Sequence, residues 1–486
     1  MSIRRKTIFG FFWASTGQFS VQAINLGVQI ILARLLLPGQ FGLIAMLSVF
    51  MAVGAILMNS GLTTSLIRTE GADDRDYSTV FYLNLAASIL LYVLLFFTAP
   101  YIASFFKQPI LTGVVRLYTV SFIIQAFADV QVTRLTKEMN FKAQTIMQIP
   151  SVAIGGLVGI VLAYDGFGVW SLVWMSLVQS SLFAAQHWFW TGWRPKFILD
   201  RDRLRYHFRF GSRLTAAWVL DVLYENIYNI LIGRFYPAAY LGYYNRAQAF
   251  QSIPVTNVGA VLNKVTYPMF ASIQDDDLRL KQTYKKLMIH VLFWITPAMI
   301  LFILAAKPLF LVLLTDKWLP AVPYFKILCL TGIVYPLHMY NLNILMVKGR
   351  SDLFFRLEVI KKVVLTVGII SVFSYGIYGF LYFQLAYSVA AVSINTLYSG
   401  KLINYPLREQ LGDVWPILVI SGIAGLLTLT VDNLVAGSYS LPNLVRVAEI
   451  GFVYMTAYLG ISLAMKMPPI LDIIQFLFKR ELKFVL

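Results

Sequence analysis

Charged residues are scarce in this sequence. Only 13% of its 486 residues are charged and 58% are hydrophobic, whereas about a quarter of the residues in a soluble globular protein are charged. Apolar stretches long enough to cross a bilayer recur from end to end, and no soluble domain of useful size separates them. The composition therefore excludes a soluble globular protein and predicts an integral membrane protein.

Cysteine is almost absent, and common enzyme motifs are missing. The single cysteine, Cys329, excludes a disulfide framework and a metal site built from cysteines. The chain has no glycine-rich phosphate loop and no nucleophile elbow, and its four histidines are scattered. We therefore expect no enzyme, no cofactor and no metal centre. The net charge of +17 lies in short segments between the apolar stretches, so we also expect no nucleic acid partner.

The apolar stretches predict an all-α polytopic membrane protein with about fourteen transmembrane helices. Lysine and arginine concentrate in alternate connections between these stretches. This asymmetry predicts that both termini and the basic segment Thr191–Arg209 are cytoplasmic. The predicted spans are residues 7–33, 40–66, 79–98, 112–133, 144–163, 168–190, 210–233, 240–270, 287–306, 321–347, 357–375, 378–400, 415–431 and 445–465.

The sequence also repeats itself. Ile31–Gly42, with its arginine, proline and glycine, is echoed by Ile232–Gly242, and Tyr164–Gly168 is echoed by Tyr375–Gly379. These pairs occupy equivalent places in two blocks of six spans. Because six is an even number, the chain returns to its starting side after the first block, and both blocks enter the membrane from the same side. Two such lobes around a central cleft are the usual construction of alternating-access transporters. The predicted regions are an N-terminal six-helix lobe (1–195), a C-terminal six-helix lobe (196–403), and two additional transmembrane helices with a cytoplasmic tail (404–486).

Amide side chains lie three or four positions apart on the first predicted span, and therefore on one face of a helix. A row of amides facing lipid would be unfavourable. The stripe therefore either makes hydrogen bonds to a neighbouring helix or lines a water-filled central cavity. The residues that we expect to line such a cavity, from the first, seventh and eighth spans, are Gln18, Gln22, Asn25, Gln29, Asn229, Asn245 and Gln248.

The seventh and eighth spans carry charges within the membrane, and such charges are a functional-site hypothesis by default. Arg213, Arg246 and Lys264 could bind an anionic headgroup, although Arg213 and Lys264 could equally extend to the inner interface and Arg246 could pair with Glu225. Asp221 and Glu225, one turn apart, could bind H⁺ or Na⁺ and couple transport to an ion gradient, or balance an arginine. Three other acids are predicted at the membrane interface, near span ends: Asp129, Asp432 and Glu449.

Three segments resemble a known family. Leu32–Met46 (LARLLLPGQFGLIAM) is similar to the opening hairpin of polysaccharide-transporter (Wzx-type) flippases, which belong to the multidrug/oligosaccharidyl-lipid/polysaccharide exporter superfamily. Arg209–Ala216 (RFGSRLTA) and Tyr267–Asp276 (YPMFASIQDD) are similar to its colanic-acid-exporter branch. The resemblance covers nearly the whole chain, and these segments are family markers rather than catalytic signatures.

The resemblance implies a flippase that moves undecaprenyl-pyrophosphate-linked oligosaccharide from the inner to the outer leaflet of the bacterial cytoplasmic (inner) membrane, for lipopolysaccharide or exopolysaccharide export. Arg213, Arg246 and Lys264 would then hold the pyrophosphate. The partners would be the lipid-linked oligosaccharide and membrane lipids, and could include a polysaccharide polymerase and export machinery. A cation-coupled multidrug exporter of the same superfamily is the main alternative, although the first span carries no acid. A membrane oligosaccharide polymerase or ligase is more distant, because the loops predicted outside are short.

Overall fold

A computed structural model describes residues 3–59, 61–198 and 200–479. Within these ranges it describes the backbone but not the side chains of residues 3–8, 11, 59, 207–214, 216–217, 256–265 and 476–479. Within these ranges the regular structure is helical, with no strand. The α-helices are α1 (Ile3–Leu35), α2 (Pro38–Asn59), α3 (Leu62–Arg68), α4 (Asp74–Phe105), α5 (Leu111–Tyr118), α6 (Val120–Lys137), α7 (Phe141–Tyr164), α8 (Val169–Trp190), α9 (Arg201–Glu225), α10 (Ile227–Phe235), α11 (Ala238–Ser272), α12 (Asp277–Leu313), α13 (Ala321–Val347), α14 (Ser351–Val372), α15 (Gly376–Leu402), α16 (Leu407–Ser438), α17 (Asn443–Ala464) and α18 (Pro468–Lys479).

Each predicted span falls on one helix or on two consecutive helices, so the predicted all-α polytopic fold is confirmed. The span predicted over 321–347 coincides with α13. Three predicted spans are broken, over α2–α3, α5–α6 and α9–α10. At the first break Gly61 precedes α3 with φ +64°, a left-handed conformation that favours glycine.

Nine stretches of the described residues are long and apolar enough to cross a membrane, and one of them, Ser351–Leu402, contains both α14 and α15. Helices α1, α8 and α11 and the α9–α10 segment are not among these nine described stretches. All of these except α8 correspond to the predicted spans that carry the amides and the intramembrane charges. Helices of this composition are not expected to face lipid on all sides.

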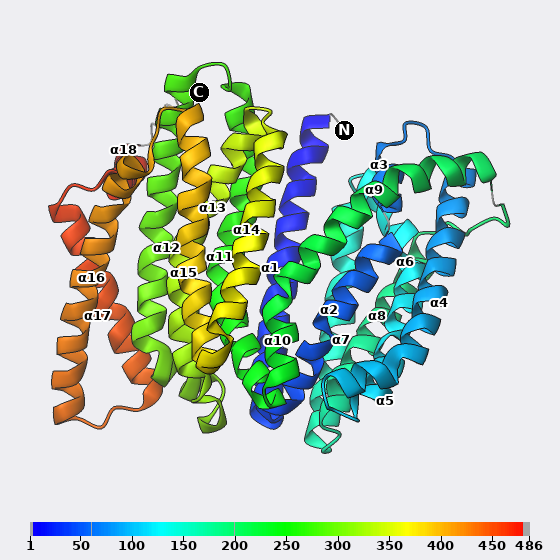
Figure 1. The fold of residues 1–486 in the computed structure, drawn as a ribbon, viewed down its shortest axis with the longest axis horizontal. Helices are drawn as coiled ribbons and strands as arrows, with labels where there is room; N and C mark the ends of the chain where they lie inside the picture. The colour runs from blue at the N-terminus through cyan, green and yellow to red at the C-terminus, as the bar shows by residue number, and fades with distance from the viewer. Residues whose placement is uncertain (1–2, 60, 199, 480–486) are drawn as a thin grey trace. The chain divides into compact units, whose positions relative to one another are not determined.

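The chain divides by contacts into two compact units, residues 1–245 and 246–486. In the first unit α7 packs between α1 and α8, and α6 contacts both α4 and α8 (Figure 1). Helix α9 contacts α2, α3 and α4, and α10 contacts α2, so the seventh predicted span belongs to this unit. The predicted regions 1–195, 196–403 and 404–486 rest on the sequence repeat rather than on contacts, and they stay a prediction.

In the second unit α12 packs against α13, α16 and α17, and α13 packs against α15 (Figure 1). Helix α18, which follows the last predicted span, is held to α12 through Asp472, whose carboxylate lies 3.0 Å from Lys286 Nζ and 3.1 Å from His290 Nε2. Burial acts to raise the pKa of Asp472, but hydrogen bonds and charge attraction from Lys286 and His290 outweigh burial and hold this pKa below its ordinary value.

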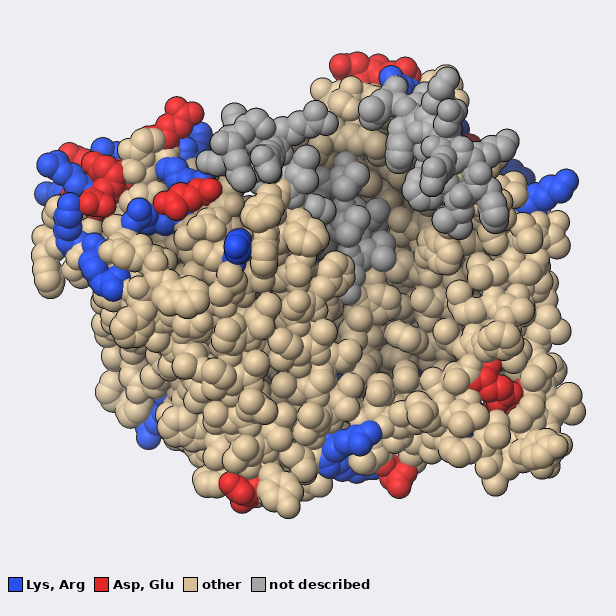
Figure 2. Space-filling view, turned by 180° about the vertical axis from the view of Figure 1, so that it is seen from behind, with Lys and Arg blue, Asp and Glu red and all other residues tan. Residues whose placement is uncertain are grey.

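Charged side chains on the face shown in Figure 2 gather at the ends of the helices in each unit, and few lie along the flanks between those ends. Exposed apolar side chains within the helices include Leu94 and Phe97 of α4, Leu157 of α7, Leu426 of α16 and Phe452 of α17. A long apolar flank between two charged ends is the surface that a bilayer requires.

Candidate functional site

Two of the amides predicted to line a cavity meet in one hydrogen-bond network of the first unit. Asn229 Nδ2 on α10 donates to Ser48 Oγ of α2 and to Asn226 Oδ1, both at 3.1 Å. Asn245 Nδ2 on α11 donates to Asn229 Oδ1 at 3.0 Å, and Ser48 Oγ lies 2.9 Å from Asn226 Oδ1. The network joins three helices, so interhelical hydrogen bonding accounts for part of these amides. Their contact with a substrate stays a prediction.

Helix α7 packs against α1 beside the amide stripe. Helix α7 approaches the face of α1 that contains Trp13 and Gly17, and Thr145 Oγ1 donates to the Trp13 carbonyl at 3.1 Å. A Cβ on Gly17 would lie 2.4 Å from Thr145 Oγ1, so the two helices are close there. The stripe retains partial or full exposure: Gln18 and Asn25 are exposed, and Gln22 and Gln29 are half-buried. It is therefore available to a polar environment.

Arg246 is the one residue of the predicted pyrophosphate site whose side chain the structure describes. It lies in α11, is 7% exposed, and places its guanidinium carbon 5.6 Å from the centroid of the buried Trp318 ring. That arrangement is a cation–π contact. Gln248, two positions further along α11, is half-buried. Arg213 lies in α9 and Lys264 in α11, but their side chains fall outside the described residues.

The two acids of the predicted coupling site lie at the end of α9. Asp221 and Glu225 are both exposed, and Glu225 is the last residue of the helix. Exposed carboxylates in a predicted span require water or a polar partner rather than lipid. Glu225 belongs to the first unit and Arg246 to the second, and the predicted ion pair between them stays a prediction.

The two copies of the sequence repeat contact each other through the turns between α1 and α2 and between α10 and α11, here called the repeat turns. A Cβ built on Gly42 would lie 1.8 Å from the carbonyl oxygen of Ala238, and one on Gly242 would lie 1.9 Å from that of Pro38. The two contacts are related by the offset of the sequence repeat. Both positions therefore require glycine, because any side chain would collide with backbone of the other turn.

One intramembrane cluster was missed by the sequence analysis. Lys361 on α14 is 3% exposed, and its Nζ donates to Glu358 Oε1 one turn earlier. On the neighbouring helices α13 and α15, His338 Nδ1 lies 3.0 Å from Asn395 Nδ2. The signal was present, since Glu358 and Lys361 both fall inside the span predicted over 357–375. Within the described residues, no group of three or more histidine, cysteine or acidic side chains could hold a metal ion.

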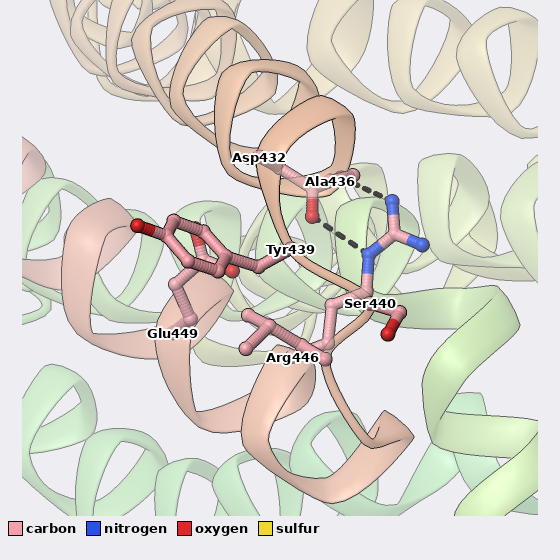
Figure 3. Close-up of a pocket in the computed structure, with 7 residues that line it drawn as sticks. Asp432, Ala436, Tyr439, Ser440, Arg446 and Glu449 are labelled. Atoms are coloured by element: carbon pink, nitrogen blue, oxygen red, sulfur yellow. Dashed lines mark hydrogen bonds and ion pairs between the residues drawn. The ribbon is translucent and has the colours of Figure 1, made fainter.

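A pocket of about 130 Å³ lies where α16 ends and α17 begins, lined by Asp432, Ala436, Tyr439, Ser440, Leu441, Arg446 and Glu449 (Figure 3). Arg446 donates from Nε and Nη2 to the two carboxylate oxygens of Asp432, each at 2.7 Å. Asp432, predicted at the membrane interface, is 8% exposed and paired.

A family of proteins described as polysaccharide biosynthesis protein matches residues 31–323 of the chain. The chain is 26% identical over 358 residues to the teichuronic acid biosynthesis protein TuaB of Bacillus subtilis (strain 168), covering 73% of this chain and 74% of that one. It is 24% identical over 367 residues to the lipopolysaccharide biosynthesis protein WzxC of Escherichia coli (strain K12), covering 74% of each. The fold is similar to that of the lipid II flippase MurJ in an inward closed conformation, with a TM-score of 0.75 at 13% identity, covering 93% of this chain and 99% of that chain.

Proposed function

Because the chain belongs to the polysaccharide biosynthesis protein family, we propose that it is a flippase that moves undecaprenyl-pyrophosphate-linked oligosaccharide from the inner to the outer leaflet of the bacterial cytoplasmic membrane. The observation that carries the proposal is the family match over residues 31–323. That match also confirms the family resemblance predicted from the sequence. Two relatives are named for polysaccharide biosynthesis, and a protein of similar fold is named a lipid flippase. A polysaccharide precursor linked to a lipid satisfies both descriptions.

The headgroup would be held by Arg246 together with Arg213 and Lys264. A buried arginine in a membrane protein is unfavourable and is a functional-site hypothesis by default. The Arg246 guanidinium contacts the Trp318 ring, and a guanidinium can bind phosphate oxygens through two parallel hydrogen bonds. Lysine contributes a point charge instead, so the two residue types are not interchangeable at this site.

The sugars would be bound by amides, and transport would proceed by alternating access. The exposed stripe of α1 and the amides of α10 and α11 offer donors and acceptors to hydroxyl groups. The repeat turns are in contact in this structure, and opening on their side requires them to separate. Delivery to a polysaccharide polymerase and export machinery would follow.

Energy coupling would use H⁺ or Na⁺ bound at Asp221 or Glu225. Both side chains are exposed on α9, so an ion from water can reach them. The proposed topology places both termini in the cytoplasm, because the lysine and arginine residues concentrate on that side. No resident cofactor takes part.

The proposal is tested by reconstituting the full chain in liposomes with a fluorescent undecaprenyl-pyrophosphate-linked oligosaccharide and measuring its protection from a membrane-impermeant quencher. We expect flipping by the wild type, loss of at least about tenfold in rate for Arg246→Ala, and partial rescue by Arg246→Lys. The factor of ten is the lower end for removing a hydrogen bond to a charged group. Arg350→Ala, at an exposed arginine before α14, is the matched control and should retain full activity.

The competing structural account, in which Arg246 only pairs with Glu225, predicts that Arg246→Gln with Glu225→Gln recovers flipping, because removing both partners avoids an unpaired buried charge. A chain that does not flip the lipid but lowers drug accumulation in cells would instead be the multidrug exporter.

A further inference from the structure

We infer that the pocket between the end of α16 and the beginning of α17 binds the primary ammonium group of a phosphatidylethanolamine headgroup through Glu449. The inference concerns a binding site for a membrane lipid, and it does not depend on the transport function proposed above. It rests on the burial of the Glu449 carboxylate without a hydrogen-bond partner, on the ion pair between its neighbours Arg446 and Asp432, and on the position of the pocket near the ends of two apolar helices.

The Glu449 carboxylate is buried without a hydrogen-bond partner. Each of its two oxygens is almost completely shielded from solvent, and neither accepts a hydrogen bond from a described residue. Glu449 nevertheless lines the pocket, next to Tyr439 in the close-up view (Figure 3). An ionised carboxylate in such a place is strongly unfavourable unless a cation accompanies it.

The neighbouring cation does not fill this role, because it is already neutralised. Arg446 gives both Nε and Nη2 to Asp432 in a two-pronged ion pair, with both distances at 2.7 Å (Figure 3). Arg446 attracts Glu449 only through its charge and makes no hydrogen bond to it. With Glu449 ionised, two carboxylates and one guanidinium leave the pocket with one net negative charge, which attracts the ammonium group of the lipid.

The acceptors that line the pocket suit an ammonium group. A primary ammonium has three N–H donors, and Glu449, Tyr439 and Ser440, which each carry an oxygen acceptor, are among the residues that line the pocket. The volume of about 130 Å³ admits a group of this size, since a single water needs only about 10–15 Å³ measured in the same way.

The position of the pocket selects a lipid as the source of the ammonium. Asp432 lies six residues before the end of α16 and Glu449 six residues after the beginning of α17, which places both roughly 9 Å from the helix ends. Leu434 and Leu444, beside the pocket in sequence, are 72% and 66% exposed, as expected for side chains that face lipid.

The test uses the purified full-length chain in detergent, stripped of lipid, with native mass spectrometry and thermal unfolding as readouts. We expect phosphatidylethanolamine to bind and to raise Tm more than phosphatidylcholine, whose trimethylated ammonium has no N–H donor, and more than phosphatidylglycerol. Glu449→Gln should weaken phosphatidylethanolamine binding at least about tenfold, the lower end for losing a hydrogen bond to a charged group, and should abolish the preference over phosphatidylcholine.

The matched control is Glu409→Gln, the same change at a carboxylate that pairs with Lys281 near the other end of α16, and it should keep the lipid preference. If Glu449→Gln fails to fold, Ala436→Leu, which fills the pocket from α16, should remove the same preference. A wild type without preference for phosphatidylethanolamine, or a Glu449→Gln variant that keeps it, would overturn the inference. The inference would also be overturned if sodium chloride or ethanolammonium chloride raised Tm, relative to choline chloride, as much as phosphatidylethanolamine does. The site would then bind a free cation rather than a lipid.

Discussion

Replacing Gly42 by alanine should force the two repeat turns apart. The added Cβ would lie 1.8 Å from the carbonyl oxygen of Ala238, whereas real Cβ contacts are essentially never shorter than 3.0 Å, so the turns must separate by roughly 1 Å. The atoms that the added Cβ would meet belong to the backbone of the other turn. A backbone cannot rotate out of the way as a side chain can. Overpacking of this kind costs about 1–3 kcal/mol, which lowers the ratio of the closed to the open arrangement about 5- to 150-fold.

The assay measures how fast a buried cysteine reacts with a maleimide. Ala45, one turn after Gly42 on α2, is 7% exposed, and Ala45→Cys in a Cys329→Ser background reports on opening of this contact. We expect the Gly42→Ala variant to be labelled about 5- to 150-fold faster than its parent. Gly242→Ala should act in the same way, because its Cβ would meet the Pro38 carbonyl at 1.9 Å.

The control is Gly39→Ala in the same turn, where the nearest atom, the Ala239 nitrogen, lies 3.8 Å from the added Cβ. This variant carries the same chemical change without the collision, and it should be labelled at the parental rate. Two results would refute this account of the repeat turns. One is equal labelling rates for the Gly39→Ala and Gly42→Ala variants, and the other is labelling at the parental rate in both Gly42→Ala and Gly242→Ala.

Two further predictions concern topology and the charges of α14. A cysteine at Asp200, between α8 and α9, should react with an impermeant reagent only after the membrane is permeabilised, because this segment is predicted to be cytoplasmic; labelling in intact cells would reverse the orientation. Lys361→Met should lower the free energy of unfolding by about 3 kcal/mol, the low end of the range for leaving one charge of a buried pair unpaired. Adding Glu358→Gln should restore most of the lost stability. A double variant no more stable than Lys361→Met would show that the pair is not structural.

The lipid pocket and the repeat turns involve different parts of the chain, and their tests are independent. The pocket belongs to α16 and α17, the two helices beyond the predicted six-helix blocks. Loss of lipid preference in the Glu449→Gln variant should therefore leave the labelling of Ala45→Cys unchanged. This separation allows a lipid effect on stability to be distinguished from an effect on opening.

The sequence by itself determined the class of the protein and the approximate places of its long apolar helices. Hydropathy is summed over one short stretch of chain, so α13 could be predicted over 321–347 without knowledge of its neighbours. The repeat of Ile31–Gly42 in Ile232–Gly242 was visible for the same reason, because it compares local patterns. The amide periodicity of α1 was visible in the same way, because it too is a pattern along one stretch of chain.

Only the tertiary structure decided which of these residues meet. The backbone contact of Gly42 with Ala238, the hydrogen bond from Asn245 to Asn229, and the unpartnered carboxylate of Glu449 all depend on segments brought together by folding. A sequence pattern reports the face of a helix but not the helix opposite to it. Whether an intramembrane polar group is satisfied depends on that opposite surface, because in lipid the protein itself must supply its partners.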